Sequence, residues 1–117
     1  MRGSHVMKSL PPAVFHLLLA LRDGEQHGYG LMHRVEDLTD GDVRMGPGTL
    51  YGAIKRMLAD GLIEEAEERP DPALDDQRRR YYRITADGER VCAAEVTRLE
   101  RLLNQARAPR PRLGHAG

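Results

Sequence analysis

Three Asp-Gly pairs, at residues 23–24, 40–41 and 60–61, divide the first 62 residues of the chain into three segments with helical patterning. Glycine commonly ends a helix because it reaches the left-handed backbone conformation at little cost. Each segment has the length of an ordinary globular helix. These helix-ending Asp-Gly pairs exclude one long continuous helix and predict three short helices in succession.

The first two segments differ in how much of their surface is apolar. The first follows Ser9-Leu-Pro11-Pro12, where Ser9 is a candidate cap and the prolines suit a first helical turn. Residues 13–21 then read AVFHLLLAL, which is typical of a helix covered on more than one face. The second begins at His27-Gly-Tyr-Gly30. It has a single stripe of apolar positions, Leu31, Met32, Val35 and Leu38.

The third segment, residues 48–60, separates an apolar face from a polar one. Its apolar side consists of Leu50, Ile54, Met57 and Leu58, and its opposite side of Thr49, Gly52, Lys55, Arg56 and Ala59. Small residues let a helix lie deep in a DNA groove, where hydrogen-bond donors reach phosphates or base edges. We expect the ring of Tyr51, on the flank, to pack while its hydroxyl reaches a phosphate. An ordinary helix with a solvated face is the alternative.

Two strand patterns and one further helix complete the order. Residues 62–68 and 78–85 are typical of strands, and they flank a polar loop with two prolines at 69–77. Thr85-Ala-Asp-Gly88 then leads into a helix at 86–107. This order predicts a mainly α fold with a small β-hairpin (α+β), which is the winged helix-turn-helix arrangement.

The apolar spacing along the last helix indicates that it packs against a second chain. Along it, Cys92, Val96, Leu99 and Leu103 recur at intervals of four and three, but only for about two heptads, so the helix is not a stable coiled coil alone. The first helix has spare apolar surface, so we expect the two helices to meet across a two-fold axis. The predicted dimer interface consists of Val14, Phe15, Leu18, Cys92, Val96, Leu99 and Leu103. Packing of both faces within one chain is the alternative.

These segments define the predicted domains. Residues 8–85 form the winged helix-turn-helix domain and residues 86–107 the C-terminal dimerisation helix, followed by a disordered tail at 108–117. Met1-Arg-Gly-Ser-His5 resembles an expression-vector leader, so we leave residues 1–7 out of the fold and expect Met7 to be the native start.

Charge is unevenly distributed along the chain. Basic and acidic residues both number 18, so the net charge is zero and DNA binding by bulk positive charge is excluded. Residues 63–76 nevertheless carry a net charge of −6 and residues 77–117 a net charge of +6. The positive part begins with Arg78-Arg-Arg80, on the strand that leaves the wing loop, where arginine suits a DNA minor groove. A solubilising charge run is the alternative.

Four motifs occur together in order: His27-Gly-Tyr, Gly46-Pro-Gly-Thr-Leu-Tyr51, Leu58-Ala-Asp-Gly-Leu-Ile63 and Arg80-Tyr-Tyr-Arg-Ile-Thr85. From about residue 10 to 106 the chain resembles the PadR family of bacterial transcriptional regulators, in its smaller subfamily with one C-terminal helix. The resemblance implies a dimeric repressor on a pseudo-palindromic operator, with Thr49, Tyr51 and the residues around Tyr29 near DNA. The acidic loop at 69–77 differs from the family's Gly-rich wing, which moves the expected wing contact to Arg78, Arg79 and Arg80. Some drug-binding members of the family stack planar ligands on a Trp at the dimer interface. This chain has no Trp, so the resemblance does not extend to that mode of ligand binding.

We therefore predict a sequence-specific DNA-binding transcriptional regulator. It is expected to act as a homodimeric repressor in the bacterial cytoplasm and to be released by a small-molecule or stress signal. The predicted DNA-binding residues are Tyr29, Thr49, Tyr51, Gly52, Lys55, Arg56, Arg78, Arg79 and Arg80. The alternative function is a winged-helix module that binds another protein and has little affinity for DNA.

Other classes of function have little support in the sequence. We find no nucleophile–base pair and no familiar set of metal ligands, so we predict neither an enzyme nor a cofactor or metal site. No apolar run approaches the roughly 18 residues of a membrane span. The single cysteine, Cys92, excludes an internal disulfide and is expected to be a small buried residue, with oxidation across the dimer axis as the alternative.

Overall fold

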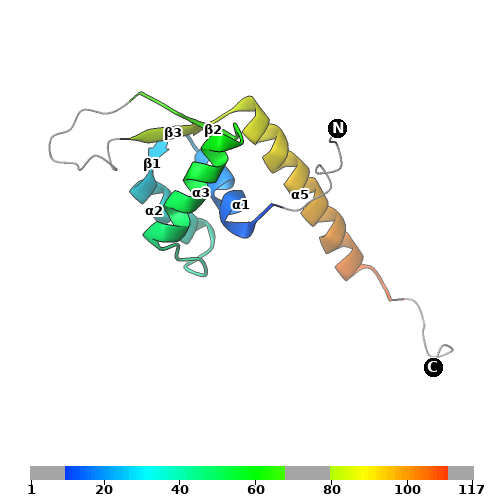
Figure 1. The fold of residues 1–117 in the computed structure, drawn as a ribbon. Helices are drawn as coiled ribbons and strands as arrows, with labels where there is room; N and C mark the ends of the chain where they lie inside the picture. The colour runs from blue at the N-terminus through cyan, green and yellow to red at the C-terminus, as the bar shows by residue number, and fades with distance from the viewer. Residues whose placement is uncertain (1–9, 68–79, 111–117) are drawn as a thin grey trace.

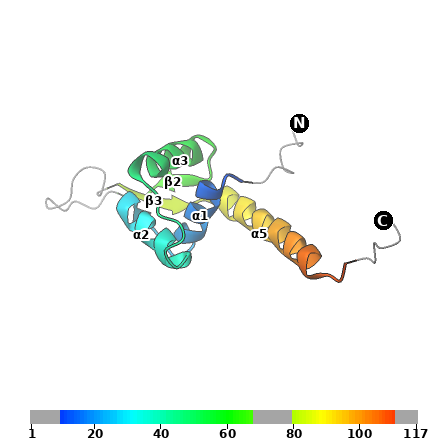
Figure 2. The ribbon, with the colours of Figure 1, turned by 90° about the horizontal axis from the view of Figure 1, so that it is seen from below.

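The computed structural model describes residues 10–67 and 80–110. Its elements are α1 (Pro12–Leu21), β1 (Gln26–His27), α2 (Gly28–Leu38), α3 (Pro47–Ala59), β2 (Ile63–Glu65), β3 (Tyr81–Ile84) and α5 (Ala86–Arg107). The three short helices and the sheet form a body (Figures 1 and 2). α5 begins against this body, and its C-terminal part, beyond Glu95, projects as an arm. The predicted helical segments are confirmed, with α5 at its predicted bounds and α3 one residue earlier at each end.

The sheet has three strands instead of the predicted two. The strand order is β1-β3-β2, and both pairs are antiparallel, with Gln26 opposite Tyr82 and Ile63 opposite Ile84. A strand as short as β1 has no alternation that would separate it from a loop in the sequence. β2 and β3 are shorter than the strands predicted at 62–68 and 78–85, whose parts within 68–79 lie outside the described residues.

The core lies between the three short helices, with α1 at its centre. α1 contacts α2, α3 and α5, which confirms that it is covered on more than one face. Leu17 of α1, Leu31 of α2 and Leu50 of α3 have no exposed surface, and Tyr82 closes the core from the sheet side. Each such side chain stabilises the fold by about 2 kcal/mol through burial. The body therefore buries its main apolar surface without a second chain.

Three residues predicted for the dimer interface belong to this core. Val14 is 4% exposed, and Leu18 and Cys92 are completely buried. Their assignment to an interface is wrong for this packing, because α5 covers part of α1 within the same chain. The sequence shows that α1 and α5 are apolar, but not which residues each hides from the other. Burial raises the pKa of the Cys92 thiol, which agrees with its predicted behaviour as a small buried residue.

The ends of the helices hold the arm against the sheet. α3 stops at Asp60-Gly61 as predicted, and Gly61 has a φ of 74°. The hydroxyl of Thr85 donates to the carbonyl of Gly61 and accepts the N–H of Gly88, which starts α5. At the other end of the body, the N-cap of α1 is Pro11, and no side chain caps this helix. Ser9 itself lies outside the described residues.

Candidate nucleic-acid interface

The outer face of α3 presents the polar residues expected there. Thr49, Gly52, Lys55 and Arg56 are all exposed, and the apolar residues of the opposite face, Leu50, Ile54 and Met57, are buried. α3 begins after Gly46 without a side-chain cap, so its first backbone N–H groups donate no hydrogen bond to a capping side chain. The face therefore combines small side chains, cationic side chains and the positive end of a helix dipole.

Packing within the chain does not account for the glycine in the middle of this face. A Cβ atom added at Gly52 would meet no atom of the chain within 4 Å. A glycine in a helix interior is also less favourable than alanine by about 1 kcal/mol. The contacts of the described residues therefore do not require a glycine at this position.

The two cationic residues of the α3 face remain accessible. Lys55 is exposed, and the Arg56 guanidinium lies 3.9 Å from the carboxylate of Asp60, one helical turn later. Both partners of this ion pair are more than half exposed, and such pairs contribute only a few tenths of a kcal/mol. Arg56 can therefore exchange Asp60 for a phosphate at small cost.

The hydroxyl of Tyr51 points into the body and not into solvent. The hydroxyl oxygen is buried, and a Cβ added at Gly28, the first residue of α2, would lie 2.6 Å from it. The expected contact between this hydroxyl and a phosphate is wrong for this conformation. A helical wheel places Tyr51 on the flank of α3, but it does not show that the start of α2 covers that flank. Tyr51 and Gly28 instead set how closely α2 and α3 approach.

The His27-Gly-Tyr motif positions α2 on the sheet. His27 is the N-cap of α2, and its Nδ1 atom accepts the N–H of Gly30 at 2.9 Å. The His27 ring also meets the ring of Tyr81 edge-on, with 5.3 Å between the centroids. Tyr29 lies between Gly28 and Gly30 on the first turn of α2 and is partly exposed. The sequence predicted a helix start here, but histidine is not among the residues that usually cap helices, so its role was missed.

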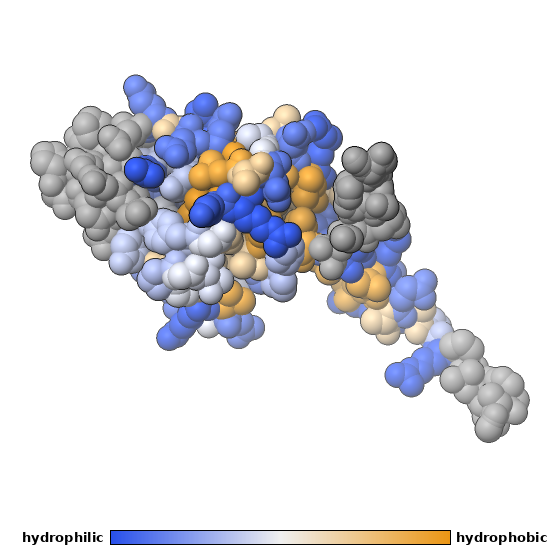
Figure 3. Space-filling model, viewed as in Figure 1, coloured by the Kyte–Doolittle hydropathy of each residue, from blue (hydrophilic) through white to orange (hydrophobic). Residues whose placement is uncertain are grey.

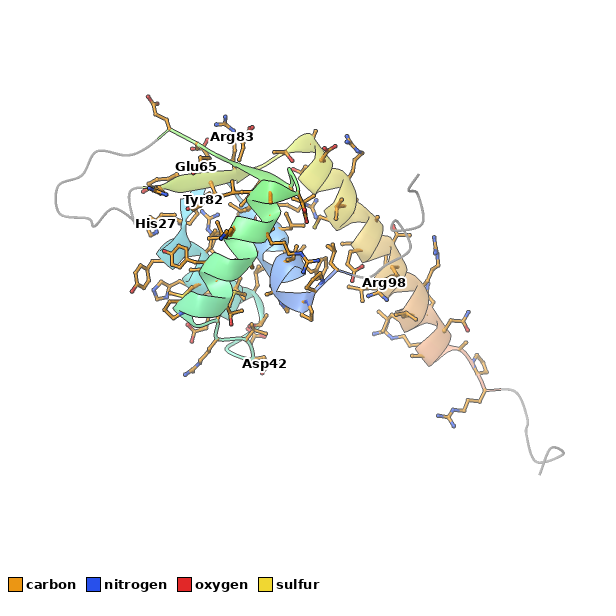
Figure 4. All side chains as sticks on the ribbon, in the orientation of Figure 1. His27, Asp42, Glu65, Tyr82, Arg83 and Arg98 are labelled. Atoms are coloured by element: carbon orange, nitrogen blue, oxygen red, sulfur yellow. The ribbon has the colours of Figure 1, made fainter. Side chains whose placement is uncertain are left out.

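On the wing side, one predicted arginine lies within the described residues. Arg80 directly precedes β3 and is exposed, while Arg78 and Arg79 lie outside the described residues. Arg83, on the outer face of the sheet, is paired within the chain. Figure 4 labels Arg83 beside Tyr82 on the sheet. The Arg83 Nε donates to Glu64 at 2.7 Å, and a terminal nitrogen donates to Glu25 at 3.3 Å. These two hydrogen bonds raise the pKa of Arg83. Arg83 thus links β3 to β2 and to the residue before β1.

Beyond the body, α5 carries apolar side chains that are exposed to solvent. Leu99, Leu102 and Leu103 are 37%, 54% and 46% exposed. Every residue from 99 to 110 is exposed, and Figure 3 shows apolar surface along the arm. Phe15 and Val96, two other predicted interface residues, are half-buried. Of the predicted interface residues, four therefore keep surface available to another chain: Phe15, Val96, Leu99 and Leu103.

Residues 10–67 and 80–110 lack two features that would indicate other kinds of function. No helix there is long and apolar enough to cross a membrane. No group of three or more His, Cys, Asp or Glu side chains there could hold a metal ion.

Sequence comparison identifies the family. The sequence model of the transcriptional regulator PadR-like family matches residues 17–94. This chain belongs to the PadR family. Transcriptional regulator Rv3488 of Mycobacterium tuberculosis is 34% identical over 90 residues, which cover 77% of this chain and 78% of that protein. An uncharacterized 37.1 kDa protein in transposon TN4556 of Streptomyces fradiae is 34% identical over 86 residues. Those residues cover 74% of this chain but only 22% of that relative.

Solved structures of PadR proteins have the same fold at low sequence identity. A PadR family transcription regulator from Clostridium difficile superposes with a TM-score of 0.65 at 20% identity, over 84% of this chain and 100% of that one. Bacillus subtilis PadR in complex with operator DNA superposes with a TM-score of 0.60 at 15% identity, over 87% of this chain and 50% of that one. The predicted winged-helix fold is confirmed, and the chain belongs to a family of transcriptional regulators, not of enzymes.

Proposed function

We propose that this PadR protein is a homodimeric repressor that binds a pseudo-palindromic operator in the bacterial cytoplasm and is released by a small-molecule or stress signal. The observation that carries the proposal is the outer face of α3, where Thr49, Gly52, Lys55 and Arg56 are exposed together. In a helix-turn-helix protein, this is the helix that enters the major groove. That Bacillus subtilis PadR is known in complex with operator DNA supports operator binding by this fold.

The arm supplies the basis for dimerisation. Three leucines exposed along one helix form apolar surface that is unfavourable in water and is covered when two copies associate. In a symmetric dimer, residue contacts are reciprocal, and the two α3 helices are related by a two-fold axis. A separation of about 34 Å would place them in successive major grooves on one side of the DNA.

The wing is proposed to add contacts with the phosphate backbone. Arg80 is exposed at the start of β3, and the neighbouring Arg78 and Arg79 extend the basic run in the sequence. Arg83 is not included, because Glu64 and Glu25 already neutralise its charge. The wing contribution is therefore expected from the part of the basic run that precedes the sheet.

A binding titration against the protein's own promoter tests the proposal. Fluorescence anisotropy at several salt concentrations between about 50 and 200 mM should show affinity that falls steeply with salt, because phosphate contacts release counterions. Lys55→Ala should weaken binding across sequences and reduce the magnitude of the salt slope by about 1. Arg79→Ala combined with Arg80→Ala should also weaken binding across sequences, and should reduce the magnitude of the salt slope by about 2, without changing the dimer.

Arg90→Ala is the matched control, because Arg90 is exposed on α5 and paired with Asp87 on the same helix. It removes one positive charge at a distance from α3 and should leave both the affinity and the salt slope unchanged. Absence of specific binding near physiological salt contradicts the repressor proposal and favours a module that binds another protein. Equal losses for Lys55→Ala and Arg90→Ala would show that only net charge matters.

A further inference from the structure

One charged side chain is buried among the described residues, and it lies on α5. Glu95 is only 6% exposed. Arg98, one turn further along the helix, binds both of its carboxylate oxygens. The Arg98 Nε donates to Oε1 at 2.9 Å and a terminal nitrogen donates to Oε2 at 2.7 Å. The backbone N–H of Leu10 also hydrogen-bonds the Glu95 carboxylate. The carboxylate therefore joins α5 to a segment 85 residues earlier in the chain.

The segment that Glu95 holds is the entrance to α1. Leu10 directly precedes Pro11, the N-cap of α1, and its side chain packs against the core. α1 has no side-chain cap and no acidic residue in its first turn, although the positive end of a helix favours an anion. Glu95 supplies that negative charge from another helix. Hydrogen bonds from Arg98 and from Leu10 lower the pKa of Glu95 against the opposing effect of burial, so the carboxylate is ionised at neutral pH.

Glu95 also marks the point where the arm leaves the body. One turn before it, Cys92 is completely buried in the core, and one turn after it, Leu99 is 37% exposed. From Leu99 to residue 110 every position is exposed. Figure 4 places Arg98 on α5 where the helix separates from α1. Among residues 10–67 and 80–110, Glu95 is thus the last buried residue along α5.

We propose that Glu95 is a positioning residue that sets the direction of the α5 arm relative to α1, and with it the separation of the two α3 helices on the operator. This inference rests on the proposed dimeric binding of an operator. Apolar packing between two helices leaves a scatter of about 15–20° around each preferred crossing angle. The bidentate contact with Arg98 holds the Glu95 carboxylate in one orientation on α5. The hydrogen bond from the Leu10 N–H then joins that carboxylate, with a preferred geometry, to the entrance of α1.

The length of the arm amplifies a small change at this pivot. Glu95 and Leu103 are eight residues apart on α5, or about 12 Å at 1.5 Å per residue. A tilt of about 10° at Glu95 moves Leu103 by about 2 Å relative to the body. The two-fold axis applies the change to both protomers, whereas DNA offers its half-sites only about 34 Å apart. A dimer with a loose pivot should bind, but should discriminate poorly between half-site spacings.

A buried ion pair is poor evidence of a purely stabilising role. Replacement of such a pair by an apolar side chain of similar volume is often neutral or stabilising. Glu95→Met therefore separates the two roles, because methionine fills the space but provides neither the contact with Arg98 nor the acceptor for the Leu10 N–H. Glu95→Gln keeps a carbonyl oxygen that can accept the Leu10 N–H, and it loses the charge that holds Arg98.

The first experiment measures affinity for a set of operators whose half-sites are moved apart or together by one base pair at a time. The wild-type dimer should bind its best spacing about tenfold more tightly than spacings one base pair different. Glu95→Met should remain dimeric by light scattering and bind all spacings within about threefold of one another, with Glu95→Gln between the two. Arg90→Ala, the charge control on the same helix, should keep the wild-type preference.

The second experiment needs no DNA and separates this inference from the proposed function. Spin labels at His33→Cys on α2 and Glu100→Cys on the arm, both exposed positions, report the direction of α5 within one chain diluted in unlabelled protein. A narrow wild-type distance distribution that broadens or shifts in Glu95→Met supports the pivot. The same distribution in both proteins overturns it, whether or not the wild type binds an operator. Wild-type protein that binds no operator would overturn the proposed function alone.

Discussion

The body and the arm of this protein use leucine in opposite ways. In the body, Leu17, Leu31 and Leu50 come from three different helices and are completely buried against one another. On the arm, Leu99, Leu102 and Leu103 lie on one helix and are between 37% and 54% exposed. The body therefore gains its stability within one chain, whereas the described residues leave the leucines of the arm exposed, where another molecule can cover them. Stability of the body should not depend on protein concentration, and association of the arms should.

The largest effect is expected when charges replace leucines of the arm, a change that tests whether the arm is buried against a second copy of the chain. Leu99→Asp combined with Leu103→Asp should raise the dimer dissociation constant by at least about a thousandfold, because unpaired carboxylates would be buried at the contact. Light scattering and analytical ultracentrifugation should report a monomer, and circular dichroism should show an intact body. Thr97→Asp, an exposed residue of α5 on the opposite side from Leu99, is the control and should stay dimeric. A double variant that remains dimeric would place the contact elsewhere.

A cavity in the body should have the opposite effect. Leu17→Ala, at a completely buried position of α1, should lower the free energy of unfolding by about 3 kcal/mol through lost burial and an unfilled cavity. Urea denaturation of the monomeric arm variant, with and without Leu17→Ala, measures the body alone. Leu102→Ala, on the arm, should change the same free energy by less than about 0.5 kcal/mol. Similar losses for both leucines would show that the arm packs on the body.

A third change concerns the contact that spaces α2 and α3 inside the body. Gly28→Ala introduces a methyl group 2.6 Å from the Tyr51 hydroxyl and should destabilise the body by about 2 kcal/mol. Tyr51→Phe removes the oxygen that it meets, so the double variant should recover part of the loss. A double-mutant cycle measures this coupling. Additive effects would mean that Tyr51 moves aside freely, and that its hydroxyl is available for the DNA contact implied by the family resemblance.

The smallest effect is expected at the junction of body and arm, where pH tests the Glu95 carboxylate. Because the folded-state pKa of Glu95 is lowered, its contribution to stability should be present above the unfolded value of about 4.3. The contribution should be lost as pH falls through the lower, folded value. The difference in unfolding free energy between wild type and Glu95→Gln, measured in urea at pH 7, 5 and 3, should shrink at the acid end. Glu100→Gln, on the exposed arm, is the matched control. A difference that is constant with pH would contradict an ionised Glu95.

Local sequence patterns predicted the helices well. The helix ends at Asp60-Gly61 and the start of α5 after Thr85 follow from residue types that act within a few positions of themselves. The two faces of α3 were also predicted, because an amphipathic pattern is a property of one helix. The same reasoning was less successful for α1, whose sequence is apolar on nearly every side. Periodicity alone could not show which of its residues α5 covers.

Contacts between segments far apart in the chain were not predicted. β1 pairs with a strand more than 50 residues later and is only two residues long. The Tyr51 hydroxyl is buried by the start of α2, and the carboxylate of Glu95 by the entrance to α1. In the sequence, Glu95 is one charged residue among many on a polar helix. Its burial becomes visible only when Leu10 lies beside it.

The sequence by itself determined the order of the helices, the polar face of α3 and the leucines of the arm. These properties depend on periodicity and on capping, which operate over one or two helical turns. The tertiary structure alone decided that Val14, Leu18 and Cys92 belong to the core, that Tyr51 spaces two helices, and that Glu95 lies at the base of the arm. Each of these depends on which surfaces meet when distant segments pack, and that outcome is a property of the whole fold.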